Sequence, residues 1–182
     1  MKLYHYVTKG NNVMEVGLLS ISANPKADIN YYIKRSGAKT HKGVCSWMEG
    51  CFKGRSRAIR FFTTPLQWTK KSLRIKELVD TCDLFEVNVT RLAKDGLVEA
   101  VYVKPSIFDE RYYTKEDLSK LLAYGVDESL IQLKSVKEID YTYQQTWNLC
   151  DDSKGLRMAP LQYYVLVIKG GVVPPKYLTK VS

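Results

Sequence analysis

The chain has 182 residues, of which 45% are hydrophobic, and its 28 Lys and Arg against 19 Asp and Glu give a net charge of +9. This length and composition fit one globular domain with its own core and exclude an intrinsically disordered chain. No apolar run is long enough for a membrane-spanning helix, and no apolar secretory core follows the first residues. We therefore expect action in a cytoplasm, or in a host cytoplasm if this is a phage or secreted effector protein.

The first part of the chain predicts a strand followed by short helices. Alternating residues favour a strand at the start, and Asn11 or Asn12 can cap a short helix that Gly17 ends. Thr64-Pro65 has the residue types of a helix start. The other segments expected here are a strand over 2–7, helices over 26–36 and 45–52, and a strand over 58–63.

The second part predicts further strands around one helix. Residues 83–90 alternate with period two, with Glu86 and Asn88 on the more polar face and Val87 on the other. Thr114 can cap a helix that runs to Gly125. Strands are also expected over 97–103, over the apolar run 162–168, and over the edge segment 177–181.

These elements do not alternate regularly, and no glycine-rich phosphate loop follows a strand, so a doubly wound parallel sheet is disfavoured. We predict one α+β domain over residues 1–182. Its mixed, mostly antiparallel sheet would have about six strands split around a cleft, with short helices. The apolar run 162–168 needs cover on both faces, so we expect it centrally in the sheet, beside the first strand.

The cysteines do not suggest a metal centre. No two of the four have Cys-x-x-Cys spacing, and only His41 lies near one of them in the sequence. We expect reduced thiols and no bound metal. A nucleophilic pair of Cys45 and His41 is a further alternative.

The first segment with possible chemistry is Lys2-Leu-Tyr-His-Tyr-Val7, followed by a polar bend, a short helix and Gly17-Leu18. A Tyr-His pair on an N-terminal strand, then one helical turn and Gly-Leu, resembles the opening of ADP-ribosyltransferases, nearest to the DNA-modifying DarT-like branch and its phage or effector relatives. The resemblance implies that His5, with Tyr4 beside it, contacts an NAD ribose from the floor of a cleft. The alternative is a histidine on a half-buried strand with its ring hydrogen-bonded to the backbone.

Two later segments extend the resemblance. In the strand that ends at Phe62-Thr63, the family carries an aromatic residue that packs on nicotinamide, and a nearby arginine can hold the pyrophosphate. The resemblance therefore assigns NAD contacts to Phe62, Thr63 and Arg57. Phe61, Thr64, Arg55 and Arg60 are alternatives, and plain core packing is the alternative for both phenylalanines.

The late strand departs from the family at its functional position. The family usually begins this strand with a glutamate that orients the ribose and activates the acceptor, whereas this chain has Tyr164 there and Gln162 two residues earlier. Tyrosine, with a pKa of about 10, is no carboxylate base, and Gln162 can bond a ribose hydroxyl without taking its proton. Another carboxylate must then serve; Glu86 is the first choice, with Glu99 and Asp109 as alternatives.

The function implied is NAD-dependent transfer of ADP-ribose to a protein or nucleic-acid acceptor, with NAD as the substrate and no metal. The alternative is a non-enzymatic basic binding protein, either a nucleic-acid binder or an inhibitor made by a phage or mobile element. Residues 34–76 carry twelve Lys and Arg against Glu49 alone, which predicts an acidic or phosphate-bearing partner and no membrane. Tyr31-Tyr32 adjoins this block and could stack on unpaired bases.

Overall fold

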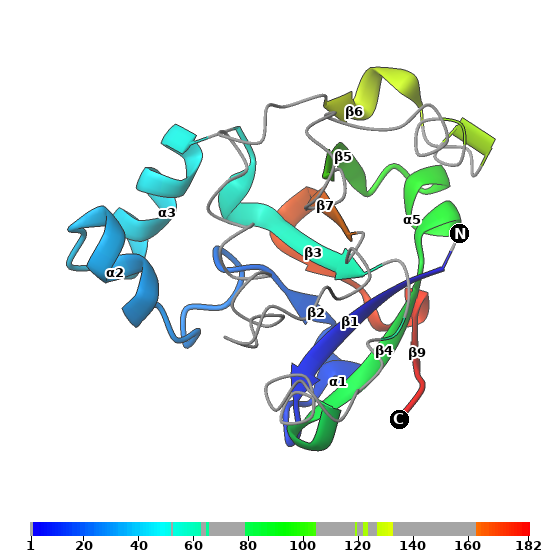
Figure 1. Cartoon of the computed structure of the whole chain (residues 1–182), viewed down its shortest axis with the longest axis horizontal. Helices are drawn as coiled ribbons and strands as arrows, with labels where there is room; N and C mark the ends of the chain where they lie inside the picture. The colour runs from blue at the N-terminus through cyan, green and yellow to red at the C-terminus, as the bar shows by residue number, and fades with distance from the viewer. Residues whose placement is uncertain are drawn as a thin grey trace, which may run out of the picture.

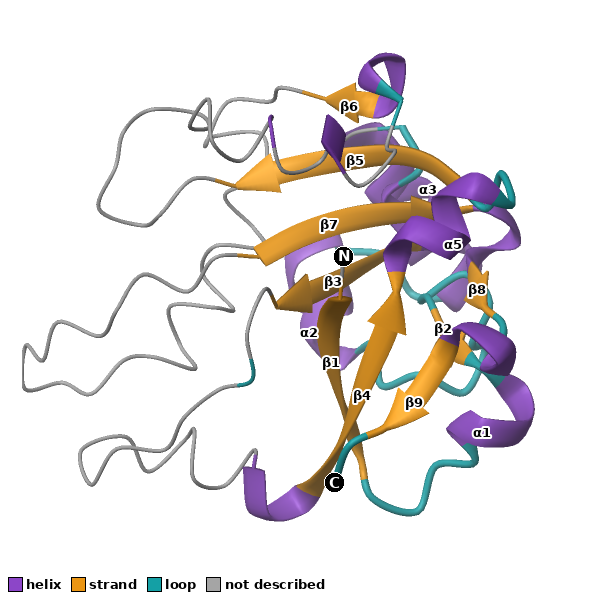
Figure 2. Cartoon of the chain, turned by 90° about the vertical axis from the view of Figure 1, so that its right-hand side faces the viewer, coloured by secondary structure: helices purple, strands orange, loops and turns teal. Residues whose placement is uncertain are grey.

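The fold is built on a seven-stranded sheet with the strand order β6-β5-β7-β3-β1-β4-β9, and a two-stranded sheet of β2 and β8 lies beside it (Figures 1 and 2). The computed structural model describes residues 2–51, 53–62, 65, 79–104, 119, 122–123, 127–132 and 163–182. In the main sheet only β5 and β6 pair in parallel; the other pairs are antiparallel. The predicted α+β class with a mostly antiparallel sheet is therefore confirmed.

The elements have the following bounds. The strands are β1 Lys2–Thr8, β2 Leu18–Leu19, β3 Ala58–Phe62, β4 Cys82–Asn88, β5 Val98–Lys104, β6 Ile131–Gln132, β7 Tyr163–Ile168, β8 Val172–Val173 and β9 Leu178–Lys180. The helices are α1 Val13–Val16, α2 Asn30–Ser36, α3 His41–Cys51 and α5 Val89–Lys94, with 3-10 turns η1 Arg55–Arg57, η2 Glu128–Leu130, η3 Lys169–Gly171 and η4 Pro175–Tyr177.

The sheet has two faces because neighbouring residues of a strand point to opposite sides. The first face carries the larger cluster of buried side chains, among them Phe61, Phe85 and Leu166, and it packs against α1, the β2–β8 pair, α5 and η4. The second face carries Phe62 and Tyr102 with their buried neighbours, and the end of α3 packs against it. This division decides which candidate residues can meet.

The apolar strand β7 lies centrally, as its composition predicts, but its neighbours differ from our expectation. It pairs with β3 through five residue pairs and with β5 on its other side. The prediction that it lies beside β1 is wrong, because β3 occupies the place between them. β1 uses its other edge for β4, in a continuous register of seven pairs from Lys2↔Asn88 to Thr8↔Cys82.

The main sheet is split between β1 and β3. These two strands share a single pair in register, Tyr4↔Phe62. Figure 2 shows the consequence: β1, β4 and β9 cross the direction of β3, β7 and β5 at a steep angle. The sheet therefore consists of two blades joined near Tyr4, which agrees with the predicted split sheet.

Local capping explains one error in the predicted elements. The alternation of residues 83–90 predicts a strand through Thr90, but β4 ends at Asn88 and α5 begins at Val89. Asn88 Oδ1 accepts a hydrogen bond from the Arg91 backbone N–H at 3.1 Å, and this helix cap overrides the β-forming residues that follow. The helices predicted from Thr64 and from Thr114 lie almost entirely outside the described residues. No helix in the described part of the chain is long and apolar enough to cross a membrane.

Candidate functional site

His5 bridges the split between the two blades. Its ring Nδ1 lies 2.7 Å from the backbone oxygen of Arg60 on β3, so the imidazole replaces a backbone pairing that the diverging strands cannot make. The ring also contacts Phe61, with centroids 5.6 Å apart and planes tilted by 57°. Because a carbonyl oxygen can only accept, Nδ1 carries the proton and Nε2 is the acceptor nitrogen of the neutral ring.

The surroundings keep this imidazole neutral. Burial lowers the pKa of His5, the hydrogen bond to the Arg60 carbonyl acts in the opposite direction, and the positive charge of Arg60 lowers the pKa further. The net result is a pKa below the ordinary value for histidine. At neutral pH the ring therefore offers a lone pair on Nε2 and no net charge.

A pocket of about 280 Å³ opens beside His5. It lies between the second half of β1, the bend at residues 9–12, α1 and the start of β2, and exposed Asn11 and Asn12 stand at its solvent side. His5 is thus a half-buried histidine bonded to the backbone, as the alternative from the sequence has it, and it also lines a pocket, as we expect of a cleft residue. The lining residues are His5, Tyr6, Val7, Thr8, Asn11, Asn12, Val13, Val16, Gly17, Leu18, Leu19 and Asn24.

Gly17 allows α1 to lead directly into the pocket wall. Its backbone has φ 86° and ψ −178°, a combination open essentially to glycine alone. A Cβ at this position would stand 2.3 Å from the backbone oxygen of Val173. The missing side chain therefore permits the close antiparallel pairing of β2 with β8, in which Leu18 faces Val173.

Asn24 also lines the pocket, and the segment before it is held by polar contacts from α3 and η1. The Ser20 and Ser22 hydroxyls lie 3.1 Å apart, and the Ser22 backbone N–H donates to the Ser56 carbonyl at 2.9 Å. His41 Nε2 donates to the Ile21 carbonyl at 2.7 Å. The position of Asn24 therefore depends on residues more than fifteen positions later in the chain.

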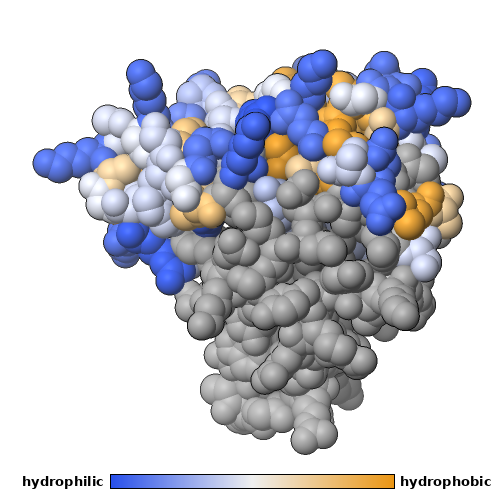
Figure 3. Space-filling model, turned by 90° about the horizontal axis from the view of Figure 1, so that it is seen from above, coloured by the Kyte–Doolittle hydropathy of each residue, from blue (hydrophilic) through white to orange (hydrophobic). Residues whose placement is uncertain are grey.

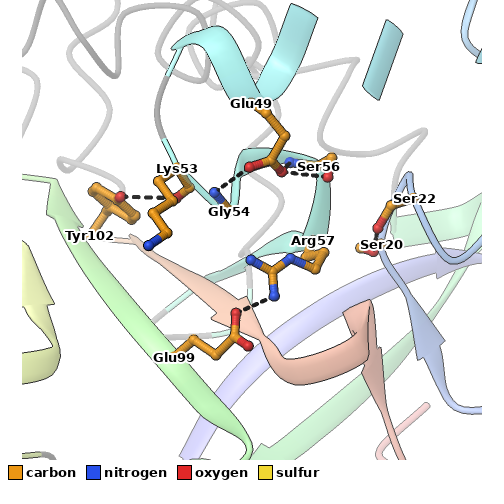
Figure 4. Close-up of polar contacts among 9 residues, drawn as sticks. All are labelled: Ser20, Ser22, Glu49, Lys53, Gly54, Ser56, Arg57, Glu99 and Tyr102. Carbon is orange, nitrogen blue, oxygen red and sulfur yellow. Dashed lines mark hydrogen bonds and ion pairs between the residues drawn. The ribbon is translucent and has the colours of Figure 1, made fainter. Parts of the chain in front are cut away.

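Glu49 organises the η1 turn that makes these contacts. Its carboxylate accepts hydrogen bonds from the Gly54 N–H at 2.7 Å, the Ser56 N–H at 3.1 Å and the Ser56 hydroxyl at 2.5 Å (Figure 4). Burial alone would raise the pKa of Glu49, but these bonds and the charge of Arg57 outweigh it, so the pKa lies below its ordinary value. The carboxylate is charged at neutral pH and locks the turn that leads into β3.

Three residues assigned to the site from the sequence lie on the other face of the sheet from His5. Tyr4 and Phe62 belong to the second face, where Phe62 is buried. Glu86 stands opposite Tyr4 in the β1–β4 register, and it pairs with Lys2 at 3.0 Å. The structure therefore does not bring Tyr4, Phe62 or Glu86 to the His5 pocket, and the aromatic ring next to His5 is that of Phe61, which is completely buried.

The remaining assignments are distributed as follows. Arg57 forms an ion pair with Glu99 of β5 and does not line the pocket (Figure 4). Thr63 and Gln162 lie outside the described residues, as does the alternative carboxylate Asp109. Of the assigned site residues that the structure describes, His5 alone lines this pocket. The sequence predicts Thr8, Asn11 and Asn12 only as parts of a polar bend and its helix cap, and no pattern in it singles out Asn24.

The structure does bring Cys45 and His41 together, one turn apart on α3. The Cys45 Sγ lies 3.9 Å from His41 Nδ1, while His41 Nε2 is engaged by the Ile21 carbonyl. Burial and the negative charge of Glu49 both raise the pKa of the Cys45 thiol. A protonated thiol is a weak nucleophile, so the pair lacks the electropositive setting of a reactive cysteine.

Comparisons with known proteins add no assignment. No protein-family model matches the chain, and neither the curated proteins nor the solved structures contain a match to it.

Proposed function

We propose that the His5 pocket binds the nicotinamide–ribose part of NAD, and that the chain is an NAD-dependent ADP-ribosyltransferase acting on a protein or nucleic-acid acceptor in the cytoplasm of its own cell or of a host. The observation that carries the proposal is the fixed tautomer of His5 at the edge of a pocket that also contains Gly17-Leu18. These residues are the ones by which the sequence resembles the family.

The chemistry of the pocket suits this ligand. An acceptor nitrogen at His5 Nε2 can receive a hydrogen bond from a ribose hydroxyl. The nicotinamide ring of NAD is positively charged, and a neutral imidazole does not repel it, whereas an imidazolium would. A volume of about 280 Å³ lies at the small end of ligand pockets, so it suits one nucleoside-sized half of the dinucleotide.

Transfer needs a further group. Loss of nicotinamide leaves a cationic sugar, which requires a negative partner nearby. No Asp or Glu is among the described residues that line the pocket, and Tyr164 at the family's glutamate position is buried in the first-face core. Glu99 is engaged by Arg57. These observations favour a second candidate function, in which the chain binds the dinucleotide without transferring ADP-ribose.

Two measurements on the same variants separate the candidates. Calorimetric titration with NAD measures binding, and chromatographic detection of released nicotinamide measures turnover. His5→Asn is the informative variant, because an Asn amide can still donate to the Arg60 carbonyl but its remaining acceptor, Oδ1, lies nearer the backbone than Nε2 does. We expect at least a tenfold loss of NAD affinity in His5→Asn, with a melting temperature within a few degrees of the wild type.

The matched control is His41→Gln at the chain's other histidine, because residue 41 does not line the pocket and a Gln amide can still donate to the Ile21 carbonyl. It should bind NAD like the wild type. Binding with nicotinamide release supports the transferase, and binding without release supports the second candidate. Absence of NAD binding, or equal losses in the two variants, would refute both.

A further inference from the structure

The helical unit α2–α3 presents a basic surface away from the pocket. Lys34, Arg35, Lys39 and Lys42 are all exposed along the end of α2, the connection and the first turn of α3. The two helices lie at the periphery of the fold, and strongly hydrophilic side chains project from that end of the molecule (Figures 1 and 3). The only acidic residue in the sequence between them and β3 is Glu49, whose carboxylate is turned to η1.

The structure divides the cations that it describes in the basic block into two groups. Arg55 is 5% exposed and its guanidinium lies 5.0 Å from the Trp47 ring, while Arg57 is paired with Glu99. These arginines serve the fold. Among the described residues of the block, Lys53 is also exposed, but the exposed cations gather on α2 and at the start of α3, where they can meet a partner.

An aromatic platform stands within this surface. Tyr31 is 36% exposed, and its ring meets the Tyr32 ring edge-on, with centroids 5.6 Å apart. One turn later, the Arg35 guanidinium lies 5.7 Å from the Tyr31 centroid and donates to its hydroxyl at 3.0 Å. Tyr31 is thus held in one orientation by its neighbours before any partner arrives, which reduces the entropy lost on stacking.

α2 contributes little to the core. It has no buried residue, although it carries two tyrosines and an isoleucine in seven positions. Tyr32, Ile33 and Ser36 are only half-buried, so this short helix gains little from packing. Its aromatic and cationic side chains are arranged for contact with something outside the domain.

From these observations we propose that α2 and the start of α3 bind single-stranded nucleic acid, with a base stacked at Tyr31 and phosphates held by Lys34, Lys39 and Lys42. Every base has a π-face, and aromatic platforms among cations are the usual means of binding unpaired strands without sequence preference. An acidic protein would use the cations but has no need of the exposed, oriented ring. The proposal does not depend on NAD binding at His5.

The test is fluorescence anisotropy with labelled oligo-dT and oligo-U of about twenty nucleotides, over a series of salt concentrations. Log affinity should fall linearly with log salt, with a slope of about −0.7 for each phosphate contact on a single strand. Lys34→Glu/Lys39→Glu should weaken binding more than tenfold and flatten the slope by about 1.4. Lys94→Glu/Lys169→Glu changes the net charge equally at exposed positions elsewhere, and should retain nearly wild-type binding.

The ring is tested separately from the charge. Tyr31→Ala should lower the affinity about tenfold without changing the salt slope, whereas Tyr31→Phe, which keeps the ring but loses the hydroxyl bond to Arg35, should retain most of the affinity. Comparison of the DNA and RNA strands identifies the preferred sugar, and tight binding of either supports the proposal. No binding at low salt, equal weakening by the two double variants, an unaffected Tyr31→Ala, or a preference for duplex would overturn it.

Discussion

Gly17→Ala tests the geometry on which the pocket depends. At φ 86° and ψ −178° an alanine is strained by about 1–3 kcal/mol. Its Cβ would also lie 2.3 Å from the Val173 carbonyl oxygen, a backbone atom that cannot rotate away, so β2 and β8 must separate. We expect a total cost on the order of 3 kcal/mol. In a domain of this size, that lowers the melting temperature by roughly 6–12 °C.

Two other glycines separate the contributions in the same thermal-denaturation assay. Gly170 has φ 69°, but no atom lies within 4 Å of the place that an alanine methyl would take, so Gly170→Ala should show backbone strain alone, about 1–2 kcal/mol. Gly50 lies in α3 with open space around it, and Gly50→Ala should be neutral or stabilising by up to about 1 kcal/mol. If Gly17→Ala melts no lower than Gly170→Ala, the close β2–β8 approach is not what fixes this wall. If the proposed function holds, Gly17→Ala alone of the three loses NAD binding.

Three further predictions concern buried polar positions. Burial would raise the pKa of Glu49, but the hydrogen bonds to its carboxylate outweigh burial and lower the pKa. The charged carboxylate therefore stabilises the fold above the unfolded-state pKa, and this stabilisation is lost as pH falls through the folded-state pKa. Glu49→Gln should therefore melt several degrees below the wild type at pH 7, with the difference shrinking below about pH 4. Burial lowers the pKa of His5 in the folded chain. As pH falls below about 6.5, the unfolded chain therefore takes up the proton first, and the fold loses stability until the folded-state pKa is reached. Urea titrations between pH 8 and 5 should show a smaller loss for His5→Asn, and an identical pH dependence would contradict the neutral ring. Tyr164 is 3% exposed, so Tyr164→Glu buries a carboxyl and should lower the free energy of unfolding in urea by several kcal/mol. Tyr164→Phe should lower it far less. Similar losses of stability in the two variants would mean that position 164 is open to water.

The longer strands of the fold are predictable from the sequence because each carries its own signal. β4 alternates with period two, and β7 is apolar at every position, as a strand with both faces covered must be. β2, β6 and β8 have two residues each, too few for any periodicity to register. The neighbours of β7 also escape prediction, since pairing depends on long-range register and not on the strand's composition.

The site was predicted only in part, because side chains along a strand alternate between the two faces of the sheet. Adjacent strand residues point to opposite faces, so the side chain of Tyr4 lies on the other face of the sheet from that of His5. Which of Phe61 and Phe62 joins His5 depends on the register Tyr4↔Phe62, and no local pattern in the sequence gives that register. Asn24 was missed because its place in the wall is set by the Ser22–Ser56 and His41–Ile21 bonds, which join distant parts of the chain.

A row of neighbouring residues across the first face includes position 164, at which the resembled family usually has a glutamate. Tyr164 on β7 stands opposite Phe61 on β3, and the Phe61 ring contacts His5 on β1. Position 164 is thus on the same face as His5, two strands or roughly 10 Å away, but the tyrosine there is packed into the core with Phe61. The position that would supply a carboxylate in the resembled family stabilises the core in this chain. If the proposed function holds, binding of NAD and its turnover therefore rest on different residues, and a chain that keeps His5, Gly17 and Leu18 can retain the first while lacking the second.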